Sequence, residues 1–373
     1  MKRIFFFMLV VMLAALSGCA PRPAAETVPT SLPQPSAAPA TNTPIPTAAP
    51  PVATPTLPPA QPAPAAAAPE AAALWTRLSD TTVPAPYQMD WSTDGQTVGI
   101  RSGDNLKLLS VPDLGTAAQI TVQQPFSLLA YSTAVNRMAV SSDFQTIELR
   151  EITTGAPRLT INPGFPLLNV SFSADGSRLV VSGTLDIGAS IYNTASGSLE
   201  KTLTGFETAA PVYSVSFSPD GRQLVWVARA TLQLQDIATG KMGLLVSNED
   251  FISAFAFSPD GTLLALGTAA TGADGVFQPV IRRFVTASGI ELTSIPITEA
   301  PPAALAINNR GVLAAGGSAL QIWWNVEPAQ LSASLPPTPG ERISGLAFSP
   351  DGTQLLSADT AGQILLWQAP PAP

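Results

Sequence analysis

The sequence predicts an all-β fold, a seven-bladed β-propeller spanning residues 74–373. Two observations carry this prediction. A pair of apolar residues two positions apart, followed by Ser or Asn and a turn, occurs seven times, and the second members of the pairs lie 40, 41, 45, 40, 50 and 41 residues apart. A period of about 40 to 50 residues built from short alternating strands is typical of propellers, with one four-stranded blade per repeat. Seven pairs therefore predict seven blades.

The seven pairs mark the first strand of each predicted blade. They are Met89/Trp91, Leu129/Tyr131, Val170/Phe172, Val215/Phe217, Phe255/Phe257, Leu305/Ile307 and Leu346/Phe348.

The turn after each pair is clearest in the copies FSPDGRQLVWV, FSPDGTLLALG and FSPDGTQLLSA, which begin at Phe217, Phe257 and Phe348. Pro fixes φ near −65°, and the Gly of each copy is suited to the left-handed conformation that closes a hairpin. A calcium loop would need several carboxylates, whereas each of these turns supplies one. We therefore expect the Asp-Gly pairs to be structural.

The FSPDG copies resemble bacterial WD-repeat proteins of the β-transducin type, over essentially all of residues 74–373. A second family turn, xATG or xASG after the third strand, occurs as Ile237–Gly240, Ile152–Gly155, Asn193–Gly197 and Thr286–Gly289. TolB-like periplasmic proteins and YVTN-type surface proteins share the SPDG turn, so the subfamily stays open. The resemblance implies a rigid blade array whose loops bind a protein or peptide through one rim.

The chain departs from that family in its polar residues. The Trp-Asp pair that closes the third strand is intact nowhere; its positions hold Trp367-Gln368, Trp323-Trp324, Tyr192-Asn193 and Gln235-Asp236. The chain has no His, so the family's Gly-His pair and its Asp-His-Ser/Thr-Trp network are missing. We expect apolar packing and backbone ladders alone to hold the blades. At the junction of the chain ends, we expect residues 74–79 to complete blade seven beside residues 363–368, since otherwise that blade stays unfinished.

The N-terminus predicts export. Lys2-Arg3 precedes an apolar run over residues 4–16 that is too short for a membrane span, and residues 1–18 therefore look like a signal peptide. The segment Leu16-Ser17-Gly18-Cys19 resembles the lipobox of bacterial lipoproteins, which implies acylation of Cys19, the chain's only cysteine. The alternative is an ordinary secretory leader with a spare thiol. The resemblance places the protein on the extracytoplasmic face of a cell membrane, held by its lipid.

Residues 19–73 predict a disordered linker behind the lipidated cysteine. Sixteen of the 38 prolines fall between residues 20 and 73, mixed with Ala and Thr. Such a composition favours extended polyproline II segments and supplies too little apolar surface to fold. Whether its threonines carry O-linked sugar stays open.

Composition limits the chemistry. The net charge of −8 and the lack of Lys/Arg clusters argue against nucleic acid as a partner. Without His, and with Cys19 acylated, histidine general bases, Ser-His-Asp triads, cysteine nucleophiles and His-ligated zinc are excluded. We find no catalytic, metal or cofactor motif and expect a non-catalytic protein. Ionisable pairs meeting in the central channel remain conceivable, because sequence alone does not reveal them.

Four residues are the candidate partner-binding positions. Val276 and Phe277 form an apolar pair in an insertion, residues 268–279, that we expect between the second and third strands of blade five. Trp324 replaces the motif's Asp and is expected to be exposed. Arg229 lies near Trp226, whose role as core or contact residue stays open.

Other large side chains have structural expectations. Trp91, Trp323 and Trp367 occupy repeat positions that pack between blades, so we expect them in the core. Arg282 and Arg283 fall where the third strand of blade five should be aliphatic, and we expect them to extend to solvent rather than bind an anion.

These observations favour a membrane-anchored, extracytoplasmic protein-binding scaffold with a protein or peptide partner and no cofactor. Two alternatives stay open: a small-ligand or cofactor propeller, quinoprotein-like or hydrolytic, that uses the central channel, and an envelope-assembly lipoprotein.

Overall fold

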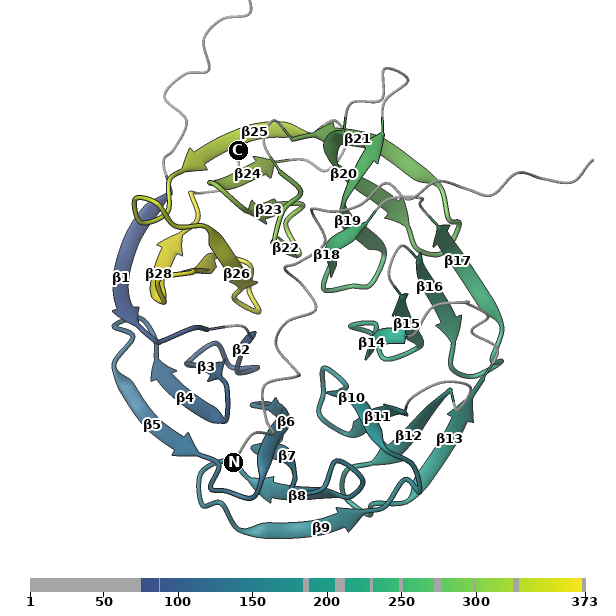
Figure 1. Ribbon diagram of the computed structural model, residues 1–373. Helices are drawn as coiled ribbons and strands as arrows, with labels where there is room; N and C mark the ends of the chain where they lie inside the picture. Colours follow the sequence, from purple (N-terminus) through teal and green to yellow (C-terminus); the bar gives the residue numbers. More distant parts are fainter. Residues whose placement is uncertain are drawn as a thin grey trace, which may run out of the picture. The chain divides into compact units, whose positions relative to one another are not determined.

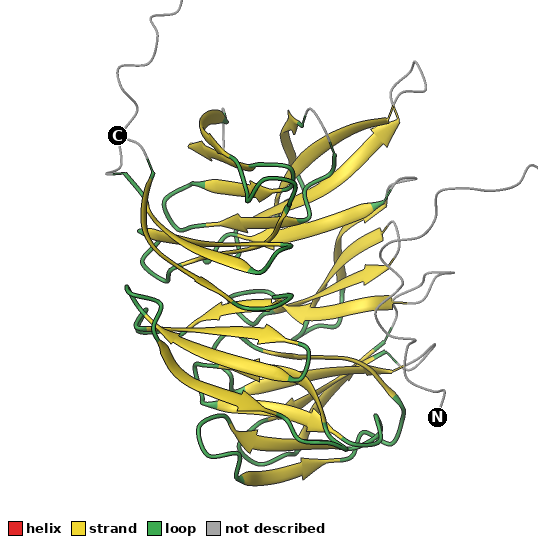
Figure 2. Ribbon diagram, turned by 60° about the vertical axis from the view of Figure 1, so that its left-hand side comes forward, coloured by secondary structure: helices red, strands yellow, loops and turns green. Residues whose placement is uncertain are grey.

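The computed structural model describes residues 75–86, 88–183, 188–204, 212–228, 231–247, 251–271, 277–297, 300–324 and 329–370. All of them belong to the compact unit that spans Ala67–Pro373. The predicted signal peptide (1–18), Cys19 and the predicted linker (19–73) lie outside the described residues. The described chain is all-β, without a helix (Figure 2), and it accordingly holds no helix able to cross a membrane.

Seven four-stranded antiparallel sheets are arranged in a ring (Figure 1), so the predicted seven-bladed propeller is confirmed. In six of the blades the strands follow the chain from the centre outward, and in the seventh the first strand of the chain, β1 (Thr76–Thr82), takes the outer position. Blades one to three comprise β2 (Gln88–Trp91), β3 (Thr97–Ser102), β4 (Asn105–Ser110) and β5 (Thr116–Thr121); β6 (Ser127–Ser132), β7 (Arg137–Ser141), β8 (Ile147–Glu151) and β9 (Pro157–Ile161); and β10 (Leu167–Phe172), β11 (Arg178–Gly183), β12 (Ala189–Asn193) and β13 (Leu199–Leu203).

Blades four to six repeat this order, and blade seven ends with β1. Blades four to seven comprise β14 (Val212–Phe217), β15 (Gln223–Ala228), β16 (Thr231–Asp236) and β17 (Met242–Ser247); β18 (Ile252–Phe257), β19 (Leu263–Thr271), β20 (Phe277–Val285) and β21 (Glu291–Pro296); β22 (Ala304–Ile307), β23 (Leu313–Gly316), β24 (Leu320–Trp324) and β25 (Gln330–Leu335); and β26 (Ile343–Phe348), β27 (Gln354–Asp359), β28 (Gln363–Gln368) and β1 (Thr76–Thr82).

The ring closes as the sequence predicts. β1 pairs antiparallel with β28, from Thr76 opposite Gln368 to Thr82 opposite Gln363. The strand begins two residues later than expected and runs three further, with a register shift at Leu78. Trp75, expected within this strand, precedes it and packs against Phe348 instead, with ring centroids 6.3 Å apart.

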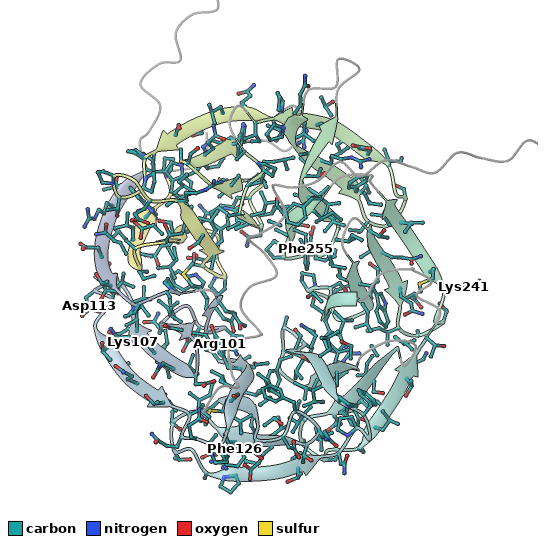
Figure 3. The ribbon with its side chains drawn as sticks, in the orientation of Figure 1. Arg101, Lys107, Asp113, Phe126, Lys241 and Phe255 are labelled. Carbon is teal, nitrogen blue, oxygen red and sulfur yellow. The ribbon has the colours of Figure 1, made fainter. Side chains whose placement is uncertain are left out.

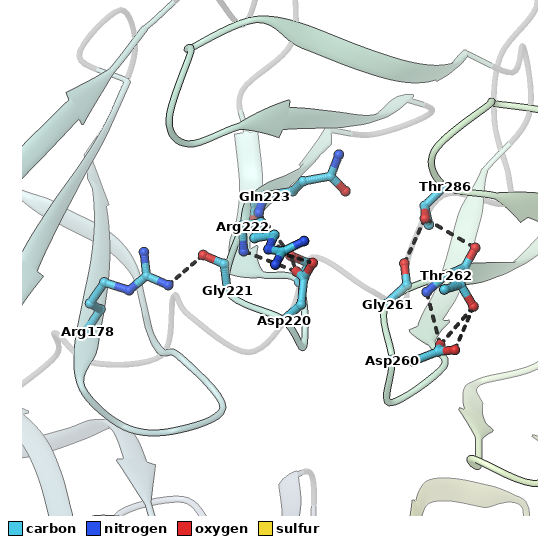
Figure 4. A network of polar contacts seen from close by, with 10 residues as sticks. Arg178, Asp220, Gly221, Arg222, Gln223, Asp260, Gly261, Thr262 and Thr286 are labelled. Carbon is cyan, nitrogen blue, oxygen red and sulfur yellow. Dashed lines mark hydrogen bonds and ion pairs between the residues drawn. The ribbon is translucent and has the colours of Figure 1, made fainter.

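The Asp-Gly turns have the predicted structural role. In blade four the Ser218 hydroxyl donates to Asp220 Oδ1 (2.6 Å), which also accepts from the backbone N–H of Arg222 (3.1 Å). Gly221 has φ +66°, which a side chain would strain. Figure 4 shows this turn beside its counterpart in blade five, where Asp260 binds Thr262 in the same way. Each carboxylate is used to hold its own turn.

Apolar clusters fill the seams between neighbouring blades. Trp91 packs where blades one and seven meet, Trp323 where five and six meet, and Trp367 where six and seven meet. Their exposed fractions are 7%, 5% and 9%, so their predicted core positions are confirmed.

The expectation that only apolar packing and backbone ladders hold the blades is wrong. In blade seven Trp367 Nε1 donates to Ser357 Oγ (2.8 Å). In blade four Trp226 Nε1 donates to Gln235 Oε1 (3.0 Å), and Gln235 Nε2 donates to the Thr204 carbonyl (2.9 Å). Hydroxyl and amide groups supply acceptors without an imidazole, so the indole N–H groups of Trp226 and Trp367 are satisfied in a chain that lacks His. Trp226 is therefore a core residue. The buried Nε1 of Trp75 has no acceptor among the described residues.

The insertion in blade five is also corrected. We expected a loop over residues 268–279, but β19 and β20 stay paired out to Thr271 opposite Phe277. Much of the insertion therefore lengthens the hairpin, because continued pairing satisfies its backbone N–H and C=O groups. Each of these strands has nine residues.

Candidate functional site

The inner strands β2, β6, β10, β14, β18, β22 and β26 surround the centre of the ring (Figure 1). Asp90 is the only acidic or basic residue on these strands. Figure 3 places Phe255, on β18, toward the centre and Asp113 and Lys241 at the outer edge. The wall is therefore hydroxyl-bearing, aliphatic and aromatic, and the inner strands bring no ionisable pair together.

In six of the seven inner strands, the residue just before the second member of the apolar pair is small. Six positions hold Ala130, Ser171, Ser216, Ala256, Ala306 and Ala347, and the seventh holds Asp90. A small residue leaves space for a large side chain of the next blade: beside Ala347, Trp91 Nε1 donates to the Ala347 carbonyl (3.1 Å). Asp90 is accommodated because Gly99 lies opposite it and the Tyr131 ring packs there.

Asp90 is half-buried at the seam between blades one and two. Thr133 Oγ1 donates to Asp90 Oδ2 (3.2 Å) and to the Trp91 carbonyl (3.1 Å). Burial raises the pKa of Asp90 to about 6, against hydrogen bonds from Thr133 and Trp91 that favour its charged form. Neither partner is basic, so this carboxylate titrates without a neutralising charge.

The described residues hold no cluster of three or more His, Cys, Asp or Glu side chains that could bind a metal. In the inner wall one carboxylate stands without a second acid, a base or a nucleophile activated by one. The described inner wall is therefore a largely uncharged surface with a single carboxylate.

A second feature is a pocket of about 170 Å³ where blades five and six meet, on the side of the turn between β23 and β24. Its walls share small or apolar side chains and exposed backbone, and no lining side chain is charged: Ile297, Ala300, Pro302, Ala315, Gly316, Gly317, Ser318, Ala319, Gln321 and Ser334. From the sequence, residues 314–318 were interpreted only as a connection between strands. The sequence feature that could have indicated a hollow here is the adjacent pair Gly316-Gly317.

The pocket lies where a long hairpin of blade five stands beside a short hairpin of blade six, which we call the blade five–blade six step. The β19–β20 hairpin of blade five has strands of nine residues, whereas β23 and β24 of blade six have four and five. The Ile297 N–H donates to the Pro279 carbonyl (2.9 Å), which fixes one wall to the long hairpin. The Ala303 N–H donates to the Gly316 carbonyl (2.7 Å) and fixes the other. A lengthened hairpin beside a shortened one thus creates the hollow.

Gly316 and Gly317 differ in this site. A Cβ on Gly316 would lie 2.5 Å from Ile343, so this glycine is required for packing between blades six and seven. A Cβ on Gly317 would meet no atom within 4 Å, and its φ is not in the left-handed region. Position 317 therefore faces open space and tolerates a side chain.

The four predicted contact residues are not brought together by the described structure. Val276 and Arg229 lie outside the described residues, and of Phe277 only the backbone is described, at the start of β20. Trp324 ends β24 and is half-buried, packed against the cluster that contains Trp75 and Trp367.

The two arginines of β20 behave differently. Arg282 extends to the surface as expected and binds Glu291 through two hydrogen bonds of 2.8 and 2.6 Å. The same expectation is wrong for Arg283, which is 1% exposed and donates to the Thr293 carbonyl. A backbone acceptor on the neighbouring strand replaces solvent for this guanidinium.

Exposed aliphatic residues on the outer strands were also missed by sequence reasoning. Leu78, Leu199, Leu245 and Leu331 lie on β1, β13, β17 and β25, each at least 44% exposed. Single exposed leucines are common on soluble proteins, so each alone indicates little.

Comparison with known proteins places WD40 repeats in the chain. The family described as WD domain, G-beta repeat matches residues 197–228 and 330–368. The first match covers the outer strand of blade three and two strands of blade four, and the second covers the outer strand of blade six and three strands of blade seven. COMPASS component SWD3 of Saccharomyces cerevisiae is 29% identical over 121 residues, which are 32% of this chain and 38% of the yeast protein.

Proposed function

We propose that this protein is a membrane-anchored, extracytoplasmic, non-catalytic scaffold that binds a protein or peptide through the blade five–blade six step. The observation that carries the proposal is the uncharged pocket in a closed ring of seven blades. WD40 repeats support a role in protein interaction, and the yeast relative is named as a component of an assembly.

The chemistry of the pocket supports an apolar side chain of a partner as its guest. A volume of about 170 Å³ is small beside the roughly 300–1,000 Å³ of sites that enclose cofactors and drug-sized ligands. The alternative of a cofactor propeller is therefore weaker at this position. Gln321 and Ser334, opposite each other on β24 and β25, add polar groups at the pocket for a peptide backbone.

The anchor part of the proposal rests on the sequence alone. Lys2-Arg3, the apolar run and Leu16–Cys19 support acylation of Cys19, and the Pro-rich segment supports a spacer between lipid and propeller. Val276, Phe277, Arg229 and Trp324 stay proposed as further partner contacts.

Site-specific photocrosslinking tests this function. A photoreactive residue at Ser318, in the pocket, should form a defined protein adduct in envelope extracts, whereas the same residue at exposed Ala117 on β5 should not. Equal adduct patterns from both positions, or none from Ser318, would remove the step as the binding surface.

A further inference from the structure

At the seam between blades one and two, the direction of a hydrogen bond depends on whether Asp90 carries a proton. Thr133 Oγ1 lies 3.2 Å from Asp90 Oδ2 and 3.1 Å from the Trp91 carbonyl oxygen, and both are acceptors when Asp90 is ionised. A hydroxyl has a single hydrogen, so it cannot donate fully to both. In that state the two acceptors share the one hydroxyl hydrogen, and each receives less than a full hydrogen bond from Thr133.

Protonation resolves the conflict. A neutral Asp90 donates its own O–H to Thr133 Oγ1, and the Thr133 hydroxyl then donates to the Trp91 carbonyl. The three groups form a directed chain in which each donor has an acceptor, and no charge stays in the seam. We propose that Asp90, Thr133 and the Trp91 carbonyl form an acid-strengthened latch between blades one and two, which tightens when Asp90 gains a proton.

The latch also reaches blade seven. Trp91 follows Asp90 in β2, and its indole Nε1 donates to the Ala347 carbonyl of β26 at 3.1 Å. Position 133 is occupied by Pro in the three best copies of the repeat, at residues 219, 259 and 350, and Pro has no hydroxyl. Equivalents of Asp90 in the other inner strands are Ala or Ser, so the pairing belongs to this seam.

No charged group of the elements packed against Asp90 offsets its charge. On β3, Arg101 donates to the Leu129 carbonyl (2.6 Å) and to Leu128; on β6, Tyr131 donates to the Gly99 carbonyl (2.8 Å). In the turn after β2, the Asp94 carboxylate accepts from Ser92 and Gln96.

The other two neighbouring segments add no free charge either. β26 carries no titratable residue. The turn that contains Thr133 leads to Arg137, which pairs with Glu151 at 3.9 Å.

The direction of the pH effect follows from the pKa of Asp90, which burial raises from 3.8 to about 6. A raised pKa in the folded state gives stability that is complete below the unfolded value and is lost as pH rises through the folded value. The latch is therefore closed in mild acid and open above about pH 6.

Urea unfolding of the full chain, followed by tryptophan fluorescence between about pH 4 and 7.5, tests the latch. Between these pH values, the unfolding constant of the wild type should rise on the order of 100-fold relative to that of Asp90→Asn, whose amide mimics the protonated acid. Asp94→Asn is the matched control, because its carboxylate lies outside the seam, and it should keep the rise. Parallel profiles of wild type and Asp90→Asn would overturn the proposal.

A second pair of variants separates the latch from a merely buried acid. In the latch the Thr133 hydroxyl binds the protonated acid, as its acceptor, more strongly than it binds the carboxylate, because the Trp91 carbonyl competes for the hydroxyl hydrogen. Thr133→Val removes this acceptor, so the NMR-detected titration of the ¹³C-labelled Asp90 carboxyl should move to lower pH. Thr133→Ser keeps the hydroxyl and should restore the wild-type midpoint. A midpoint near 4 in the wild type, or one that Thr133→Val leaves in place or raises, would contradict the latch even if Asp90→Asn fails to fold.

Discussion

Trp367 Nε1 donates a 2.8 Å hydrogen bond to Ser357 Oγ across neighbouring strands of blade seven. Both residues are buried, and in the same blade the Asp359 carboxylate accepts from the backbone N–H and hydroxyl of Thr338 and from the N–H of Gln363. Thr338 thus supplies hydrogen-bond donors to this buried carboxylate in a chain that has no histidine to do so. Blade seven combines this polar network with the joint between the two ends of the propeller.

Ser357→Ala should destabilise the propeller because it leaves the buried indole N–H of Trp367 without an acceptor. A cost of about 1–3 kcal/mol is expected from the free energy of unfolding in urea. In the double variant Ser357→Ala/Trp367→Phe, the cost should be smaller than the sum of the two single costs. Strict additivity would show that the bond contributes nothing.

Removal of β1 should open the ring. A chain beginning at Ala71 keeps Trp75 and the strand Thr76–Thr82, whereas one beginning at Val83 exposes the β28 edge and the apolar residues beneath it. The shorter chain should melt earlier or aggregate in a thermal scan. Identical melting curves would mean that the β1–β28 pairing does not stabilise the propeller.

Asp260→Ala should lower the melting temperature by a few degrees at neutral pH. The Ser258 hydroxyl and the Thr262 N–H hold the pKa of Asp260 below 3.8, because they bind its charged form. A carboxyl whose pKa is depressed in the folded state contributes stability above its unfolded pKa, and this contribution is lost as the pH falls through the folded pKa. The difference in melting temperature between wild type and Asp260→Ala should therefore narrow in acid. Ser258→Ala should act in the same direction, and a gap that widens in acid would refute this role.

Cys19→Ala tests the anchor. If Cys19 carries the lipid, the variant should leave the membrane fraction or keep its leader, while the wild type partitions into detergent. A cleaved Cys19→Ala protein retained in membranes as well as the wild type would reject lipid anchoring through this residue.

The repeated elements were predictable because their cause is local. The turn from Phe217 to Gly221 contains its own Pro, Asp and Gly, and the seven apolar pairs give the blade count without any knowledge of distant contacts. Closure by β1 followed from counting strands. Its limits did not, because Trp75 packs against Phe348, a distant residue, instead of joining the strand, and the strand has a register shift at Leu78.

The sites depend on residues far apart in the chain, and the sequence did not reveal them. Thr133 meets Asp90 across 43 residues, and the pocket joins Pro302 to Gly317 and Ser334 through the folding of blade six. The insertion in blade five was recognised by its length, but its effect depends on the short hairpin of the next blade. Arg283 shows the same limit, since its acceptor, Thr293, becomes a neighbour only when β20 and β21 pair.

The most direct test of the proposed scaffold measures the affinity of the partner captured at Ser318 for the wild type and for Gly317→Leu. Position 317 faces open space, so leucine should fill the pocket without straining the backbone. Ala117→Leu on β5 is the control for added apolar surface. We predict at least about tenfold weaker binding for Gly317→Leu, with an unchanged melting temperature and full binding by Ala117→Leu. Full affinity of Gly317→Leu would contradict the account.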